Sequence, residues 1–235
     1  AAGMLAGLVT GILHTVLGIP DILSGILTQI ALYSVNMNIM GRSNQAVSVD
    51  KYNLVVSLRY IPAAIVTTIL FLVVIIGVLY WYFGTEQGFT IRATGCNPNM
   101  SRAQGINTNF AKVLALVISN GLVGLAGGLY AQYQGNSDVN MGRGAIVIGL
   151  AAVIIGEVLG EAIFGKRLNF IGRLAFVAIG AIIYYVVIAF VLWLGLPSED
   201  MKLFSAIVVA IFLAIPYLRG KSKTSFKRAA KNGGN

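Results

Sequence analysis

Charged side chains are scarce in this chain of 235 residues: Asp, Glu, Lys and Arg make up 11%, and hydrophobic residues 57%. The mean hydropathy is +0.82. A soluble domain carries about 25% charged residues, so this chain lacks the polar surface that water requires. The composition therefore excludes an ordinary soluble domain and predicts a protein of the lipid bilayer.

Cysteine and histidine occur once each, as Cys96 and His14. One cysteine excludes an intramolecular disulfide and a cysteine-based metal cluster, and we expect Cys96 to be a small, unreactive residue. His14 has no cysteine partner nearby, so we interpret it as a packing or interfacial residue. Neither an Asp-rich calcium loop nor an H-E-x-x-H pattern occurs. We therefore expect no catalytic residues, no metal site and no enzymatic activity in this chain.

A phosphate-binding loop is also missing, although one segment comes close to it. Gly160 to Arg167 reads GEAIFGKR, which ends in Arg167 where the P-loop needs the Ser or Thr that binds magnesium. The segment also ends an apolar run, whereas a P-loop joins a buried strand to a helix. We expect no cofactor in this chain; if ATP drives it, a separate subunit binds ATP and magnesium.

Long apolar runs fill most of the sequence. A membrane helix needs about 20 apolar residues, and the runs 60–85, 113–137 and 174–198 carry no formal charge. The runs lack the alternation of a membrane β-barrel, so helices are the solution that pairs every backbone group in lipid. Shorter runs cover 1–20, 22–41, 144–156 and 203–218.

These runs predict an all-α, polytopic helix bundle with six to seven membrane segments. We expect 1–218 to form the transmembrane domain and 219–235 a basic tail, with 145–160 as a broken or partial span. The chain begins with AAGMLAGLVTG, as if inside a helix, so we also expect further helices before it.

The basic residues predict the orientation. If the spans alternate and the tail is cytoplasmic, twelve of the seventeen Lys and Arg residues lie inside, in 84–112, 157–173 and 219–231. The positive-inside bias favours this arrangement, which puts the C-terminus in the cytoplasm. Six of the basic residues belong to the tail, which we interpret as an anchor on anionic lipid and not as a nucleic-acid site.

Small and polar residues recur inside the spans. Glycines at four-residue spacing let membrane helices approach closely, and we expect helix packing at Gly3, Gly7, Gly11, Gly124, Gly128, Gly156 and Gly160. Uncharged polar side chains are costly in lipid unless they face protein or water. The candidates for a solute path are Gln29, Ser34, Asn36, Asn120 and Gln132. Contact between helices is an equally open reading for each of them.

Two carboxylates, Glu157 and Glu161, lie four residues apart and therefore on one helix face. They stand near Lys166 and Arg167, which favours an interfacial ion-pair cluster. We find no carboxylate deep within a span, where carriers coupled to protons or sodium usually need one.

A polar segment, TIRATGCNPNMSRAQGIN at 90–107, interrupts the apolar runs on the predicted cytoplasmic side. Asn97 is a favoured helix N-cap, Pro98 suits the first helical position, and Gly105 suits the left-handed position after a helix. The pattern predicts a helix of about two turns, which is marginal alone and must pack on something. Met100 and Ala103 share one face. The helix either inserts into a partner's groove or lies at the lipid interface.

The run GFTIRATGCNPNMSRAQGIN, followed by LALVISNGLVGLAGGLYAQYQG, resembles the permeases of bacterial ATP-binding-cassette (ABC) importers, in the branched-chain amino acid and ribose permease superfamily. The pattern R-A-x-G-x-N-x-x-x-[AS]-x-x-x-G-I is met by Arg92, Ala93, Gly95, Asn97, Ser101, Gly105 and Ile106. HTVLGIPDILSGILTQIALYS and VNMGRGAIVIGLAAVIIGE are similar to a subgroup for amino-acid-like solutes, including tryptophan.

The resemblance implies a permease that transports an aromatic or branched-chain amino acid. It implies three partners besides membrane lipid: an ABC ATPase that binds ATP and magnesium, an extracytoplasmic solute-binding protein, and a second permease copy in a homodimer. The loop within 84–112 would be the coupling element. Its residues toward the ATPase would be Arg92, Asn97, Pro98, Met100, Ser101, Arg102, Ala103 and Gly105.

Two other functions remain open. A secondary carrier or channel would move solute without ATP and depend on an ion gradient. A non-transporting membrane subunit would show neither flux nor solute-stimulated ATPase activity. The lack of a deep carboxylate weighs against the first, and the intramembrane amides against the second.

Overall fold

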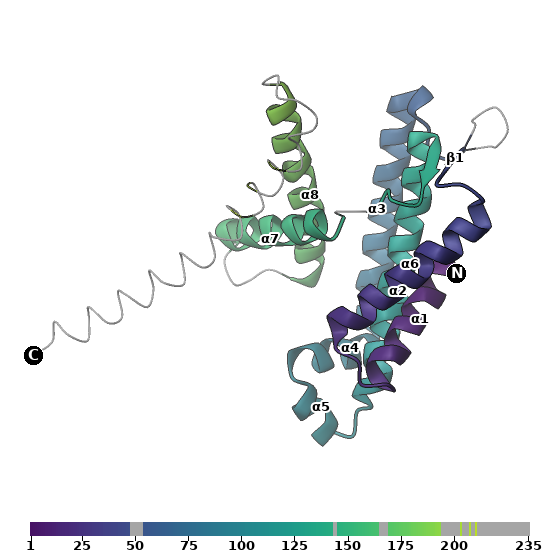
Figure 1. Ribbon diagram of the computed structural model, residues 1–235. Coiled ribbons are helices and arrows are strands. Elements are labelled where there is room, and N and C mark those ends of the chain that lie inside the picture. Colours follow the sequence, from purple (N-terminus) through teal and green to yellow (C-terminus); the bar gives the residue numbers. More distant parts are fainter. Residues whose placement is uncertain are drawn as a thin grey trace, which may run out of the picture. The chain divides into compact units, whose positions relative to one another are not determined.

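The computed structural model describes residues 1–47, 54–142, 145–164 and 169–193, and the single positions 203, 207 and 210. Within these residues the regular secondary structure is α-helical apart from one short 3-10 helix and two short strands, which confirms the all-α fold class (Figure 1). The elements are α1 (Ala2–Thr15), α2 (Asp21–Met40), β1 (Asn44–Ala46), η1 (Leu58–Tyr60), α3 (Ile61–Phe83), α4 (Glu86–Cys96), α5 (Pro98–Ala103), α6 (Thr108–Gln134), β2 (Asn136–Asp138), α7 (Ala145–Phe164) and α8 (Phe170–Trp193).

Four helical stretches in the described residues are long and apolar enough to cross a membrane. They are α2, the η1–α3 stretch Leu58–Phe83, α6, and Phe170–Phe190 of α8. The first helix, α1, is a shorter apolar helix of 14 residues. For 145–160 the sequence suggested a broken or a partial span. A broken helix is wrong, because α7 is one α-helix of 20 residues; a partial span stays a prediction. The expected segment 203–218 and the tail 219–235 lie outside the described residues, apart from the three single positions.

Large apolar side chains cover the outside of these helices. Ile22 is 80% exposed and Val66 is 67% exposed, whereas the fully buried side chains are mostly small. In water such a surface would be unfavourable, but in a bilayer apolar side chains can face the acyl chains. The exposed apolar side chains therefore agree with the membrane location that the composition predicts.

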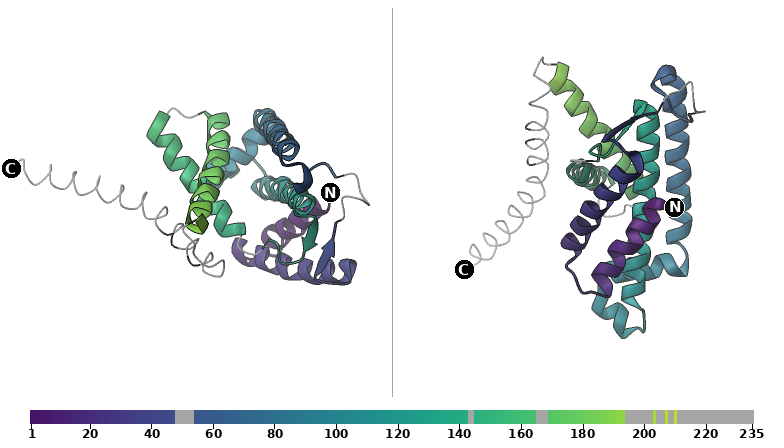
Figure 2. Two further views of the ribbon diagram at one scale, coloured as in Figure 1. Left: turned by 90° about the horizontal axis from the view of Figure 1, so that it is seen from above. Right: turned by 45° about the vertical axis from the view of Figure 1, so that its right-hand side comes forward.

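Close contact between α1 and α6 organises the first compact unit, residues 1–142 (Figure 2). The glycines of α1 lie directly against the α6 backbone: a Cβ atom added to Gly3 or Gly7 would collide with the carbonyl oxygen of Asn120 or Leu116, respectively. At Gly11 the added Cβ would lie 3.0 Å from the Cα atom of Val113. One added to Gly124 would lie 3.3 Å from the Cα atom of Gly3. Only residues without a side chain allow the two helices to come this close.

Hydroxyl groups connect α1 to α2. The Thr10 and Thr28 hydroxyl oxygens lie 2.9 Å apart, and both residues are buried. Each hydroxyl also lies within hydrogen-bond distance of a carbonyl oxygen one turn earlier, that of Ala6 or Ser24. These local bonds satisfy polar groups that would otherwise be costly in an apolar interior.

A two-stranded antiparallel ribbon joins the end of α2 to the end of α6. Asn44 of β1 pairs with Asp138 of β2, and flanking hydrogen bonds run from Val47 N to the Gly135 oxygen at 2.8 Å and from Val139 N to the Ser43 oxygen at 3.0 Å. The ribbon lies at the end of this unit opposite α4 and α5 (Figure 1). The loops after α2 and after α6 are therefore on the same side, as the alternating spans require.

The second compact unit, which begins at residue 143, is formed in its described part by α7 and α8. The helices touch where a Cβ on Gly156 would meet the Phe176 carbonyl and one on Gly180 would meet the Ala152 carbonyl. Next to this contact, Ile155 and Tyr184 are almost completely buried with Ala151 and Ile188. Small residues at the crossing thus allow larger side chains to pack on one side of it.

The glycine contact between α1 and α6 predicts a reversal of the usual effect of Gly→Ala in a helix. We expect Gly7→Ala to lower the free energy of unfolding by about 1–3 kcal/mol, because the new methyl group collides with backbone that cannot move easily. The measurement is thermal unfolding of the purified protein in detergent.

The matched control is Gly25→Ala in α2, where nothing lies within 4 Å of the added Cβ. Here the substitution should be neutral or stabilise the protein by up to about 1 kcal/mol, the helix-propensity difference. Equal stability of the two variants would contradict the close α1–α6 contact.

Candidate functional site

Asn97 is shared by two helices at the centre of the polar segment. Its backbone N–H donates to the Ala93 oxygen at 3.0 Å and closes α4, while its side-chain oxygen accepts from Met100 N at 3.0 Å and opens α5. Asn97 has extended backbone dihedrals, as an N-cap requires. Pro98 follows at the first helical position, where no N–H is needed. Helices α4 and α5 are therefore separated by Asn97 alone, which caps both of them.

The C-terminus of α5 is closed by a Schellman motif. Gly105 has φ +81°, its N–H donates to the Arg102 oxygen at 2.9 Å, and Ile106 N donates to the Ser101 oxygen at 3.0 Å. This pair of bonds requires the left-handed conformation that glycine adopts without strain. The short helix that the sequence predicts is thus present, with both of the expected boundary residues.

One side of α5 is anchored and the other is exposed. Ser101 is buried and donates to the Asn97 oxygen at 3.0 Å, and Arg102 Nε donates to the buried Thr108 hydroxyl at 3.0 Å. In contrast, Met100 is 61% exposed and Ala103 is exposed too. The predicted shared face of Met100 and Ala103 is therefore the face that α5 presents outward.

A sharp turn places α4 beneath the membrane helices. Thr85 caps α4 by accepting from Gly88 N, and a Cβ on Gly88 would collide with the backbone of Tyr82 and Phe83. Thr94 is buried on α4, which packs against α6. Arg92 lies on exposed α4 surface with its guanidinium 5.8 Å from the Phe89 ring centre. The polar segment is thus a defined pair of short helices on the α6 end, at the foot of the unit in Figure 1.

The five candidate solute-path residues are not brought together. Asn120 lies at the α1–α6 contact and its amide donates to the Leu116 oxygen at 3.0 Å. Gln132, near the ribbon, accepts from Val55 N at 3.0 Å. Both bonds support the reading as helix and loop contacts for these two amides.

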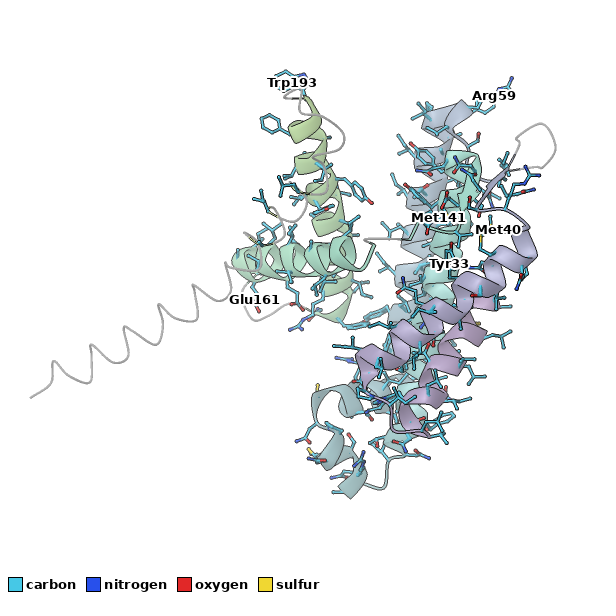
Figure 3. All side chains as sticks on the ribbon, in the orientation of Figure 1. Tyr33, Met40, Arg59, Met141, Glu161 and Trp193 are labelled. Atoms are coloured by element: carbon cyan, nitrogen blue, oxygen red, sulfur yellow. The ribbon has the colours of Figure 1, made fainter. Side chains whose placement is uncertain are left out.

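The other three candidates, Gln29, Ser34 and Asn36, are exposed on α2. Gln29 and Asn36 lie seven residues apart and hence on one helix face, turned away from the buried Ser24 and Thr28. Tyr33, labelled in Figure 3, lies between them in the same row. Ser34 lies on a different face. Among the candidates, only Gln29 and Asn36 share an exposed face in the described structure.

The carboxylates of α7, Glu157 and Glu161, are both exposed; Glu161 is labelled in Figure 3. Their expected basic neighbours, Lys166 and Arg167, lie outside the described residues.

The glycines predicted to pack between helices differ in their surroundings: Gly160 is buried, whereas no atom lies within 4 Å of a Cβ added to Gly128.

A second polar cluster was missed by sequence reasoning, which took His14 for a packing or interfacial residue. His14 Nδ1 lies 2.7 Å from Asp21 Oδ1 and 2.9 Å from the Ile19 oxygen, and its Nε2 lies 2.9 Å from Lys112 Nζ. The cluster joins α1, α2 and α6 at the end that carries α4 and α5. Asp21 stands close to His14 in the sequence, but Lys112 is 98 residues away, so only the fold brings it there.

Comparison with known proteins gives a match over residues 1–216 to the family described as "Branched-chain amino acid transport system / permease component". A tyrosine transport system permease protein of Clostridioides difficile (strain R20291) is 40% identical over 230 residues, covering 97% of this chain and 75% of the relative. A galactofuranose transporter permease protein of Escherichia coli (strain K12) is 28% identical over 220 residues, covering 91% and 60%. A nucleoside ABC transporter permease protein of Lactococcus lactis is 35% identical over 104 residues, covering 40% and 33%. No solved structure matches.

The shared Asn97 predicts a local effect of its removal. We expect Asn97→Ala to destabilise α5 by about 1 kcal/mol, the usual loss for an N-cap, and so to raise amide hydrogen exchange roughly five-fold across 98–106. Hydrogen exchange read by mass spectrometry of that peptide is the measurement. The control is Asn99→Ala, an exposed residue next to the cap, and equal exchange in both variants would contradict the capping role.

Proposed function

This chain belongs to the family of permease components of branched-chain amino acid transport systems, and from that premise we propose that it forms the solute path of an ABC importer for an amino acid with an aromatic side chain. The relative named a tyrosine transport permease supports this substrate, because its 40% identity extends over 97% of the chain. Branched-chain amino acids, which the family description names, are the second class to test.

We further propose that α5 is the coupling helix, docked on a separate ATPase subunit. The observation that carries this is the geometry of α5: it is capped at both ends, bonded to Thr108 of α6 through Arg102, buried at Ser101, and exposed at Met100 and Ala103. A short helix with an apolar exposed face is suited to insertion into a groove on a partner. ATP and magnesium would be bound by that partner.

The orientation and the other partners follow as parts of the same proposal. With α5 in the cytoplasm, the β1–β2 ribbon at the opposite end of its unit faces outward, toward an extracytoplasmic solute-binding protein. The C-terminal tail then lies in the cytoplasm by the positive-inside rule. A second permease copy would complete the path as a homodimer, with Gln29 and Asn36 of α2 as candidates to line it, since exposed amides in a membrane helix require polar neighbours or water.

The substrate assignment predicts ATP-driven uptake of tyrosine. Proteoliposomes that contain the permease, its ATPase and its binding protein should accumulate radiolabelled tyrosine only when ATP is enclosed with the ATPase on the inner side of the membrane. Excess unlabelled tyrosine should compete strongly, and leucine competition tests the branched-chain alternative. Uptake driven by a proton or sodium gradient without ATP would contradict the proposal and favour a secondary carrier.

The docking role predicts the effect of filling the outward face of α5. Ala103→Trp should abolish ATP-driven uptake and co-purification of the ATPase, because a large side chain cannot fit the groove that accepts alanine. Arg102→Glu should act similarly by reversing the charge and breaking the bond to Thr108. The matched control, Ala103→Ser, should retain uptake, and elution of all variants at the wild-type volume in size-exclusion chromatography shows that the bundle is intact. Normal uptake by Ala103→Trp would defeat the docking role.

A further inference from the structure

We propose that His14 is a positioning residue that transmits movement of α5 to α1 and α2 through Lys112. This inference rests on the proposed function, since it assumes that α5 receives the signal from the ATPase. It assigns a role to a polar cluster of the described residues that neither the solute path nor the docking face explains.

The chemistry of the cluster fixes the direction of each hydrogen bond. A lysine ammonium group can only donate, so at 2.9 Å Lys112 Nζ donates to His14 Nε2. With Nε2 as the acceptor, Nδ1 of the ring is the donor, toward Asp21 Oδ1 at 2.7 Å and the Ile19 oxygen at 2.9 Å. One ring thus connects the start of α6 to the end of α1 and the first turn of α2.

The cluster continues toward α5 along one face of α6. Thr108 and Lys112 are four residues apart and therefore lie one above the other on that helix. Thr108 accepts the hydrogen bond from Arg102 of α5 at 3.0 Å. The sequence of contacts is Arg102 to Thr108, one turn of α6 to Lys112, then His14 and Asp21. The route from α5 thus consists of side-chain hydrogen bonds at its two ends and one turn of α6 between them.

The two bonds of the ring differ in exposure, which ranks their importance. Asp21 is 77% exposed, whereas Lys112 is half-buried and the His14 side chain, which both bonds share, is 17% exposed. Water screens and competes for the Asp21 bond, and the Ile19 carbonyl remains as an alternative acceptor. In the described residues the Lys112–His14 bond is the ring's hydrogen bond to α6. The glycine contacts join α1 to α6 independently of it, so variants at this bond test the polar route and not the helix packing.

The experiment compares coupling and not only activity. In proteoliposomes with the ATPase and the binding protein, basal ATPase activity, its stimulation by tyrosine-loaded binding protein, and tyrosine uptake are measured for each variant. Lys112→Met and His14→Leu should each reduce stimulation and uptake about ten-fold, the factor that corresponds to loss of one charge-assisted hydrogen bond. Basal ATPase activity and ATPase co-purification should stay at the wild-type level.

Conservative variants and a matched control separate transmission from simple stability. His14→Gln and Lys112→Arg retain an acceptor and a donor and should restore most of the stimulation. Asp21→Asn should have a small effect. Thr10→Val removes a different buried contact between α1 and α2, one turn from His14, and should leave the ratio of stimulated to basal activity unchanged even if it lowers thermal stability.

The outcomes distinguish this inference from the proposed function. Full stimulation in Lys112→Met, or an equal loss of stimulation in Thr10→Val, would overturn the relay while leaving the importer assignment intact. Failure of the conservative variants to restore coupling would overturn it as well. Absence of ATP-driven uptake by the wild-type assembly would overturn the function, and the relay with it.

Discussion

The contact of two helix backbones, α1 against α6, is the constraint on which the rest of the first unit depends. Because Gly3 and Gly7 let the backbones touch, the end of α1 reaches the start of α6, and His14 comes within hydrogen-bond distance of Lys112. In lipid, apolar side chains gain little by leaving their surroundings, so close packing must supply the attraction that burial supplies in water. The same principle recurs in the second unit at Gly156 and Gly180.

Much of the fold could be predicted because the bilayer imposes it. Apolar runs of sufficient length become helices, and Asn97, Pro98 and Gly105 mark the ends of α5 by local backbone chemistry alone. One of the two forms predicted for 145–160, a broken helix, is wrong. It was inferred from the shorter charge-free run, yet Glu157 and Glu161 lie within an unbroken α7 and are exposed there.

The sequence predicted only those features of the candidate site that depend on residues close together in the chain. The outward face of α5 follows from the spacing of Met100 and Ala103, but the solute-path candidates depended on which helix faces meet. Asn120 and Gln132 were chosen for polarity and turned out to bond to neighbouring backbone. The His14 cluster was missed for the same reason. The sequence does not indicate that Lys112 is a partner of His14, because the two residues come close only when α6 packs against α1.

The ribbon of β1 and β2 has a mechanical consequence. It ties the end of α2 to the end of α6 through backbone hydrogen bonds. At the opposite end the connection is indirect: His14 of α1 lies against Asp21 of α2 and Lys112 of α6. Backbone ladders resist stretching more than a single side-chain contact does. We therefore expect any relative motion of α2 and α6 to be smallest at the ribbon and largest at the end near α5.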